Sequence, residues 1–243
     1  MISVNKVKDL NTGFYKDLDT NFQTACELSE KEFSHSEIIE LLRNGNIPEK
    51  QIAALKLEKV DNQEEAKILV SNLTGCDGKI REAVALKISN LLNTNSSLKK
   101  LFIYPEIFAD ATIDINGNIC RLVLDSVKIL KSENFTPKYL AKIVQFIKEA
   151  YKELDSFIFR DKKYVINKQL FKLYWCLESL KLFVDEMDKK ALLSILERAI
   201  REKEYTIREK VAQILIMTSD EVFEPLIKML KDDENYYVRE VFK

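Results

Sequence analysis

The chain has 243 residues, of which 46% are hydrophobic and 32% are charged, so it can bury a substantial core. Five glycines and four prolines are too few for the many turns of a β-sheet protein, whereas abundant Leu, Ile, Lys and Glu are typical of helices. The formal net charge of −1 excludes an overall field that would draw the molecule to nucleic acid or to an anionic membrane.

The cysteines and the N-terminal residues indicate a cellular compartment. Cys26, Cys76, Cys120 and Cys176 have spacings that match no metal-ligand motif, and free thiols among apolar residues are typical of a reducing compartment. The first residues lack the apolar core of a secretory signal, and no run approaches the ~20 apolar residues of a membrane span. The sequence therefore predicts a cytoplasmic protein without membrane association.

Apolar residues recur with a 3.6-residue period along most of the chain, which predicts an all-α fold. An N-terminal segment, residues 1–35, is expected to hold one extra helix near residues 20–33, and residues 36–243 are expected to form antiparallel helix pairs. The last pair is short, so we expect either that the chain continues beyond Lys243 or that this apolar edge meets a partner. The expected pairs are about 36–44 with 48–59, 63–73 with 79–93, 97–110 with 117–132, 137–154 with 162–184, 188–201 with 205–217, and 219–231 with 236–243.

The second helix of each pair follows a residue with a carboxylate or amide side chain. Such residues cap helix N-termini by accepting hydrogen bonds from unpaired backbone N–H groups. The leading residues are Asn46, Asp77, Asn116, Asp161, Glu204 and Asn235. The residues four positions later are Lys50, Arg81, Cys120, Val165, Arg208 and Arg239. The recurrence predicts an internal repeat.

The cations of this repeat are expected to link its turns. An Arg four residues into a helix can reach the leading side chain of its own pair or of an adjacent pair, which would give a polar ladder. One amphipathic pair cannot bury its apolar face alone, whereas a row of pairs can. The sequence therefore predicts an α-α superhelix, or solenoid, of about six helical hairpins.

Three segments carry a resemblance to a known family. DGKIREAVALKI, EYTIREKVAQIL and PEKQIAALKL resemble HEAT repeats, which are armadillo-like α-solenoids. The resemblance covers most of residues 36–243 and is weakest at Asn116 and Asp161, where no cation follows four residues later. HEAT arrays generally act as protein-binding scaffolds whose second helices line a concave face. The resemblance therefore implies a non-catalytic scaffold that binds a protein or peptide partner on that face.

The sequence shows no recognisable catalytic constellation. His35 is the only histidine, so a His-pair zinc site is excluded, and His35 is expected at a helix start in an exposed or capping role. The glycines form no phosphate-binding loop. Carboxylate pairs such as Glu64-Glu65 and Asp232-Asp233 are expected by chance at this charge density. We therefore predict no catalytic, metal-binding or cofactor-binding residues and no cofactor.

A basic stretch leaves an enzymatic alternative open. Residues 137–210 carry 17 Lys and Arg against 12 Asp and Glu. Lys168, Lys172 and Trp175 lie in this stretch, where the tryptophan either packs in the core or contributes to a base-stacking or partner-binding surface. Some proteins that resemble HEAT arrays are DNA glycosylases for alkylated bases, which grip DNA in a basic groove. DNA-alkylation repair is therefore the alternative function, although acidic flanking segments disfavour nucleic-acid binding. A bilin-lyase-like activity is disfavoured further, because no repeated Cys or His marks a tetrapyrrole site.

Overall fold

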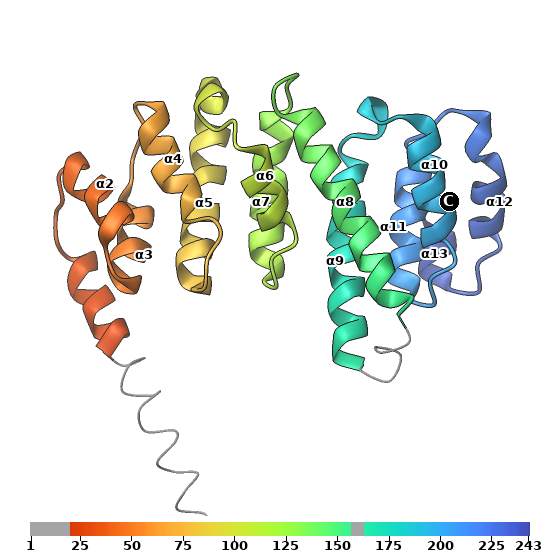
Figure 1. The fold of residues 1–243 in the computed structure, drawn as a ribbon, viewed down its shortest axis with the longest axis horizontal. Helices are drawn as coiled ribbons and strands as arrows, with labels where there is room; N and C mark the ends of the chain where they lie inside the picture. The colour runs from red at the N-terminus through yellow and green to blue at the C-terminus, as the bar shows by residue number, and fades with distance from the viewer. Residues whose placement is uncertain (1–19, 157–162) are drawn as a thin grey trace, which may run out of the picture. The chain divides into compact units, whose positions relative to one another are not determined.

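The computed structural model describes residues 20–156 and 163–243, and every regular element in these residues is a helix (Figure 1). The all-α fold expected from the apolar period is therefore confirmed. The helices divide into two compact units. Unit 1 comprises Met1–Ala111 and Asn116–Leu130, and unit 2 comprises Thr112–Ile115 and Lys131–Lys243.

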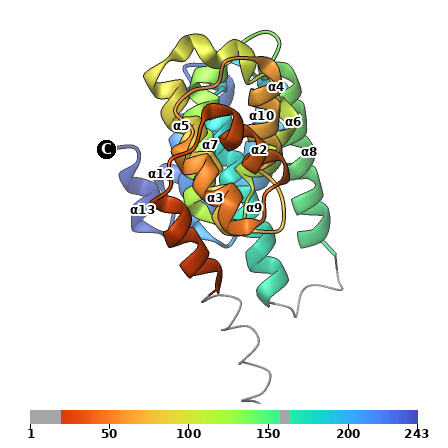
Figure 2. The same cartoon turned by 90° about the vertical axis from the view of Figure 1, so that its left-hand side faces the viewer.

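Unit 1 contains helical residues 20–29 followed by consecutive helix pairs. Within this unit, α5 packs against both α3 and α7, while α2 contacts both α3 and α4 (Figures 1 and 2). The second helices of successive pairs therefore form one row. The elements are α2 (His35–Asn44), α3 (Ile47–Lys56), α4 (Gln63–Ser71), α5 (Gly78–Thr94), the 3-10 helix η1 (Ser96–Leu101), α6 (Pro105–Thr112) and α7 (Gly117–Leu130).

The core of unit 1 lies along this row of helices. Leu42, Leu57, Leu69, Val84 and Leu92 are all fully buried. Each such aliphatic side chain contributes about 1.5–3 kcal/mol when it is removed from water. The residues come from four successive segments, so the apolar stripe of one helix pair is covered by the next pair.

Unit 2 contains the longest described helices. α8 packs against α9, and α11 contacts α9, α10, α12 and α13. As in unit 1, the second helices α9, α11 and α13 form a row (Figure 1). The elements are α8 (Thr136–Leu154), α9 (Lys163–Lys181), η3 (Val184–Glu186), α10 (Lys189–Ala199), α11 (Tyr205–Leu215), η4 (Glu221–Phe223), α12 (Glu224–Lys231) and α13 (Tyr236–Glu240).

An aromatic cluster fills the core between α8 and α9. The ring of Tyr139 stacks on Phe135 at a centroid distance of 5.4 Å and lies 5.5 Å from the ring of Phe183. Its hydroxyl shares a 2.8 Å hydrogen bond with the Ser179 hydroxyl. Because all four side chains are buried, the bond provides the polar partner that a buried phenol needs.

Prolines shift two of the expected helix boundaries. The helix expected over residues 97–110 is instead η1 followed by α6, which begins at Pro105. The helix expected from residue 219 begins as η4, and α12 follows with Pro225 in its first turn. Proline has no N–H and restricts the residue before it, so it fits the start of a helix and not its interior.

The leading residues of the repeat cap helices wherever the structure describes them. Asn46 accepts a hydrogen bond from the Glu49 N–H, and the Glu49 carboxylate accepts one from the Asn46 N–H, which completes a capping box. Asp77 accepts from the N–H groups of residues 79 and 80 at 2.9 and 3.0 Å. Asn116, Glu204 and Asn235 each accept from the N–H group two residues later. Asp161 and the Val165 side chain lie outside the described residues.

The lengths and polarity of the helices bear on membrane association. Among the described residues, no helix is both long enough and apolar enough to cross a bilayer.

Candidate functional site

The cations of the repeat bind oxygens at helix turns. Arg81 donates to the main-chain carbonyl of Gly75 at 2.7 Å, and Lys50 donates to the Asn72 side chain at 3.1 Å. Both of these partners lie in the turn region between α4 and α5, and the leading residues Asn46 and Asp77 accept from the first N–H groups of their own helices.

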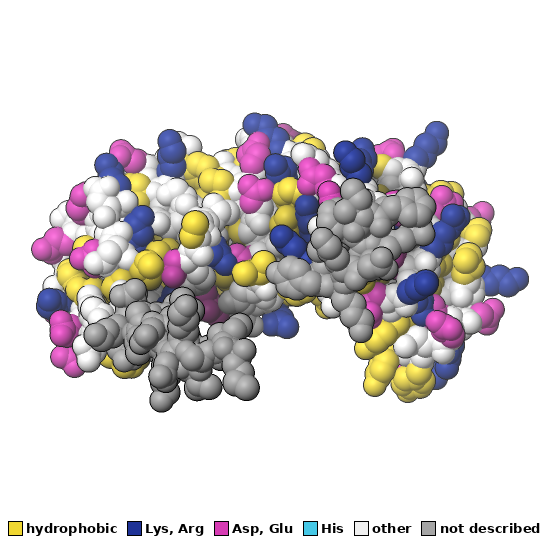
Figure 3. All heavy atoms as spheres, turned by 60° about the horizontal axis from the view of Figure 1, so that its bottom comes forward, with side chains coloured by type: hydrophobic (Ala, Val, Ile, Leu, Met, Phe, Trp, Pro, Cys, Tyr) yellow, Lys and Arg dark blue, Asp and Glu magenta, His cyan; other side chains and the backbone are white. Residues whose placement is uncertain are grey.

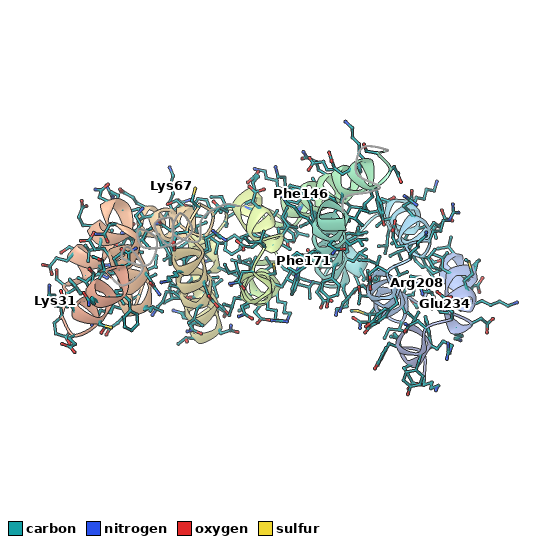
Figure 4. The ribbon with its side chains drawn as sticks, turned by 90° about the horizontal axis from the view of Figure 1, so that it is seen from below. Lys31, Lys67, Phe146, Phe171, Arg208 and Glu234 are labelled. Atoms are coloured by element: carbon teal, nitrogen blue, oxygen red, sulfur yellow. The ribbon has the colours of Figure 1, made fainter. Side chains whose placement is uncertain are left out.

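Arg208 makes several contacts of this kind. Its side chain is 8% exposed and forms a two-pronged pair with Asp233, with N–O distances of 2.7 and 3.0 Å. It also donates to the carbonyls of Glu202 and Lys203 at 2.8 and 2.9 Å. Figure 4 shows Arg208 beside Glu234, whose carboxylate lies 3.4 Å away. Arg208 therefore fixes both the turn before α11 and the turn before α13.

The charge state of Asp233 reflects these contacts. Burial acts to raise the pKa of its carboxyl group, but hydrogen bonds from Arg208 and from the Asn235 N–H outweigh burial and lower the pKa overall. Arg239 donates to the main-chain carbonyl of Asp233. Asp233 is therefore an ionised structural anchor between two turns.

The three residues considered for partner binding lie on α9. Trp175 is 5% exposed, and its ring packs edge-on against Phe171 and Tyr174 at 6.1 and 5.3 Å. Lys172 pairs with a glutamate of α8 at 3.1 Å and lies 4.5 Å from the centre of the Phe146 ring, whereas Lys168 is exposed. Figure 4 shows Phe146 and Phe171 on these two helices. The tryptophan therefore packs inside unit 2, which is the core alternative, and cannot stack on a base there without rearrangement.

Acidic partners neutralise much of the basic stretch. Lys181 and Lys210 both pair with Glu178, at 2.6 and 2.7 Å, and Arg198 pairs with Asp155. The face in Figure 3 shows Lys and Arg side chains interspersed with Asp and Glu. Phosphate binding requires several unpaired cations on one face, so this arrangement gives no support to a DNA groove.

A cleft of unit 2 brings ionisable side chains together beside the turn that Arg208 fixes. Its volume is about 600 Å³. One wall comes from the end of α8 and from α9, and the other comes from the end of α10 and the turn before α11. The lining residues are Leu154, Asp155, Ile166, Leu170, Arg198, Arg201, Glu202, Lys203 and Glu204.

Two carboxylates share one arginine in this cleft. Arg198 lies 2.5 Å from a carboxylate oxygen of Asp155 and 3.8 Å from one of Glu202. The Asp155 side chain is 63% exposed, whereas the Glu202 side chain is 16% exposed. Burial raises the pKa of the Glu202 carboxyl group; Arg198 opposes this effect, and the charge of Asp155 adds to it. The cleft thus holds a half-buried acid with a raised pKa beside a solvent-exposed, ion-paired carboxylate.

Tyr151 supports the arginine from the interior. Its ring centre lies 4.9 Å from the Arg198 guanidinium, and its buried hydroxyl has no hydrogen-bond partner among the residues that the structure describes. Burial raises the pKa of the phenol strongly, and the negative charge of Glu202 adds to this effect. Tyr151 therefore stays neutral and holds the guanidinium in place through a cation–π contact.

This combination of groups has the properties of an acid–base site. A carboxyl group with a raised pKa can donate a proton, an ionised carboxylate can accept one from water, and an arginine can stabilise developing negative charge. Within the described residues the cleft contains all three, together with further cations at Arg201 and Lys203.

The sequence relationships define the class of protein. Residues 86–243 match the family of haloacid dehalogenase-like hydrolases, and because this match covers well over half of the chain, the chain belongs to that family. Among solved structures, an engineered protein is similar at 12% identity with a TM-score of 0.45, over 86% of this chain and 94% of that one. No curated protein matches the chain.

The family match corrects the reading of the turn motif. The HEAT-repeat resemblance, the non-catalytic scaffold inferred from it and the DNA-glycosylase alternative are all wrong, because the matched family is one of hydrolases. The prediction that the chain is not an enzyme is wrong for the same reason. A capping residue followed by a cation is a general device of helix turns, so the motif indicates helical hairpins without specifying a family.

The matched region limits where hydrolytic groups can lie. Its described part contains helices as its only regular elements, so such groups must come from helix faces, helix ends and the turns between them. Asp155 lies at the C-terminal end of α8, and Glu202 lies in the turn after α10. Sequence reasoning missed both. The four-residue spacing of Arg198 and Glu202 indicates that these two side chains can pair on one face of the chain. No local pattern indicates that Asp155 lies close to them.

Proposed function

We propose that the chain is a hydrolase whose acid–base chemistry takes place in the cleft between the ends of α8 and α10. The observation that carries the proposal is the half-buried Glu202 carboxyl group, which lies beside the Arg198–Asp155 pair in one cleft. All three residues lie within the region that matches the hydrolase family. In this cleft a water molecule would attack the substrate bond that is hydrolysed.

Each residue has a distinct role in this proposal. Glu202 donates a proton to the leaving group, because its raised pKa favours the protonated form relative to an ordinary glutamate. Asp155 accepts a proton from the attacking water. Arg198, held by the Tyr151 ring, stabilises the negative charge that develops as water adds. Arg201 and Lys203 favour substrates that carry an anionic group.

The experiment is a turnover assay on the full chain with p-nitrophenyl phosphate and p-nitrophenyl acetate, each with and without added Mg²⁺. We expect hydrolysis of at least one substrate, with a kcat that falls as pH rises through the pKa of Glu202. E202Q should lower kcat about 10²- to 10⁴-fold. The matched control is E197Q, which changes an exposed glutamate of α10 outside the cleft and should leave kcat unchanged.

The outcomes separate the activity from its location. Absence of turnover by the folded wild type on both substrates overturns the hydrolase proposal. Turnover that E202Q and D155N leave unchanged overturns the assignment of this cleft and places the chemistry elsewhere in the chain.

We further propose that the protein resides in the cytoplasm. The structure shows Cys26, Cys76, Cys120 and Cys176 as free thiols, a state that a reducing compartment maintains. Fractionation of cells that express the tagged full chain tests this proposal, and recovery in a secreted or membrane fraction would contradict it.

A further inference from the structure

Three side chains with metal-binding atoms meet in unit 1, far along the sequence from the proposed hydrolytic cleft. His35 lies in the first turn of α2, Asp61 lies just before α4, and Glu65 lies in the first turn of α4. The His35 Nε2 atom lies 3.1 Å from a Glu65 oxygen and 3.8 Å from an Asp61 oxygen, and all three donor atoms lie within 4.8 Å of one another. We propose that His35, Asp61 and Glu65 form a binding site for a divalent transition metal, with Zn²⁺ as the preferred ion.

The spacing of the donor atoms fits tetrahedral coordination. Zinc–nitrogen and zinc–oxygen bonds of about 2.0–2.2 Å place neighbouring ligand atoms about 3.3–3.5 Å apart in a tetrahedron. The two distances from His35 Nε2, 3.1 and 3.8 Å, lie on either side of this range. The third separation, between the Asp61 and Glu65 oxygens, is within 4.8 Å, so metal binding draws the side chains closer together.

The Glu65 carboxylate is already held in place for this role. One of its oxygens accepts the Asp61 N–H at 2.8 Å, and the other accepts the Asn62 side-chain amide at 2.8 Å. Its own N–H donates to Asn62 at 3.0 Å. Such outer contacts orient a metal ligand and reduce the entropy lost on binding.

A cation already lies against this cluster. The Lys59 ammonium group is 2.7 Å from the Asp61 oxygen that faces His35. The Lys59 side chain is 63% exposed, so its pair with Asp61 is weak and the lysine can swing into solvent when a doubly charged ion binds. A divalent metal ion therefore replaces the single positive charge of Lys59 with two positive charges beside the Asp61 and Glu65 carboxylates.

The site has room for a further ligand. The His35, Asp61 and Glu65 side chains are 32%, 46% and 15% exposed, and His35 lines a cavity of about 480 Å³ together with Phe33, Lys56 and other residues. Water can therefore enter and complete the coordination shell, as it does in zinc sites with three protein ligands.

The ligand set selects the kind of metal. One imidazole nitrogen favours zinc and related transition ions, whereas Mg²⁺ and Ca²⁺ prefer oxygen atoms alone. The proposed site lies outside the hydrolase match, which begins at residue 86. The metal-site proposal is therefore independent of the proposed hydrolytic activity.

Zinc titration of the full chain by calorimetry tests the proposal. Cys26 and Cys76 are exposed thiols that could bind zinc by themselves, so the titration uses a C26S/C76S background. We expect one equivalent of Zn²⁺ to bind and no comparable binding of Mg²⁺. Zinc at about 100 times its Kd should raise the Tm of the full chain by about 5–10 °C.

Variants of the ligands identify the site. H35A and E65Q should each weaken zinc binding about tenfold or more, and a glutamine at position 65 can still accept the Asp61 N–H. The matched control is E64Q, which changes the adjacent exposed carboxylate that pairs with Arg43 and should leave zinc affinity unchanged. X-ray absorption of the zinc-loaded protein should show one imidazole and oxygen ligands without sulfur.

Two results would overturn the proposal. One is a folded C26S/C76S protein that binds no zinc at millimolar concentration. The other is zinc binding that H35A and E65Q leave at wild-type strength, because the ion would then occupy a different place.

Discussion

Arg208 and Asp233 form a two-pronged ion pair, at 2.7 and 3.0 Å, between two side chains that are each only 8% exposed. The same guanidinium holds the carbonyls of Glu202 and Lys203, so one side chain joins the last turns of unit 2 to the wall of the proposed cleft. This contact is therefore the most direct link between the stability of unit 2 and its chemistry.

Loss of the guanidinium should destabilise unit 2 strongly. R208A leaves the Asp233 carboxylate buried without its partner and leaves two turn carbonyls without a donor, so we expect a loss of about 3–5 kcal/mol in the free energy of unfolding. Urea denaturation measures it. K228A removes an exposed cation of α12 and should change the free energy of unfolding by less than about 0.5 kcal/mol. An equal effect of the two substitutions would show that the pair adds nothing.

Asp233 should make unit 2 sensitive to acid. Its pKa is lowered in the folded state, because Arg208 and the Asn235 N–H outweigh the effect of burial. Such a group contributes stability that is fully present above its unfolded pKa of about 3.9 and is lost as pH falls through its folded pKa. Urea midpoints measured from pH 7 down to pH 3 should fall for the wild type. In D233N this part of the pH dependence should vanish, and a parallel decline in both proteins would contradict the assignment.

Glu202 should have the opposite effect. Its folded-state pKa is raised, chiefly by burial, so the folded protein loses stability as pH rises from the unfolded pKa of about 4.3 to the folded pKa. We expect E202Q to be at least as stable as the wild type at pH 7 and to gain relative to it between pH 4 and pH 7. Thermal unfolding at these two pH values measures the difference. A variant that is destabilised at pH 7 would show that the charged form of Glu202 is the stabilised one.

The cap of α5 should contribute a modest share of the stability of unit 1. Asp77 accepts from two N–H groups in the first turn, and D77A leaves both without that partner. We expect a loss of about 1 kcal/mol in the free energy of unfolding. D77N keeps an acceptor oxygen and should retain most of the stability. If the two variants lose equal amounts, the carboxylate acts through its charge rather than through capping.

The local structure of the chain follows from interactions between residues close in sequence. The 3.6-residue apolar period placed most of the described helices within a few residues of their observed bounds, and Asn46 and Asp77 marked helix starts because capping depends on N–H groups two or three residues away. Because the turn motif depends only on residues close in sequence, it led to the wrong family. The motif reflects the hydrogen bonding of a helix start, which helical hairpins of any family share.

The sites arise from contacts between distant residues. His35 meets Glu65 across 30 positions, and Arg198 meets Asp155 across 43, so no local pattern could reveal either pair. The sequence by itself determined the all-α class, the helix pairs and their caps, since these depend on period and on neighbouring hydrogen-bond donors. Only the tertiary packing decided which carboxylates are buried, which cations neutralise them and which carboxylates face a cleft. The reason is that burial and the distances between charges depend on how the helices pack against one another.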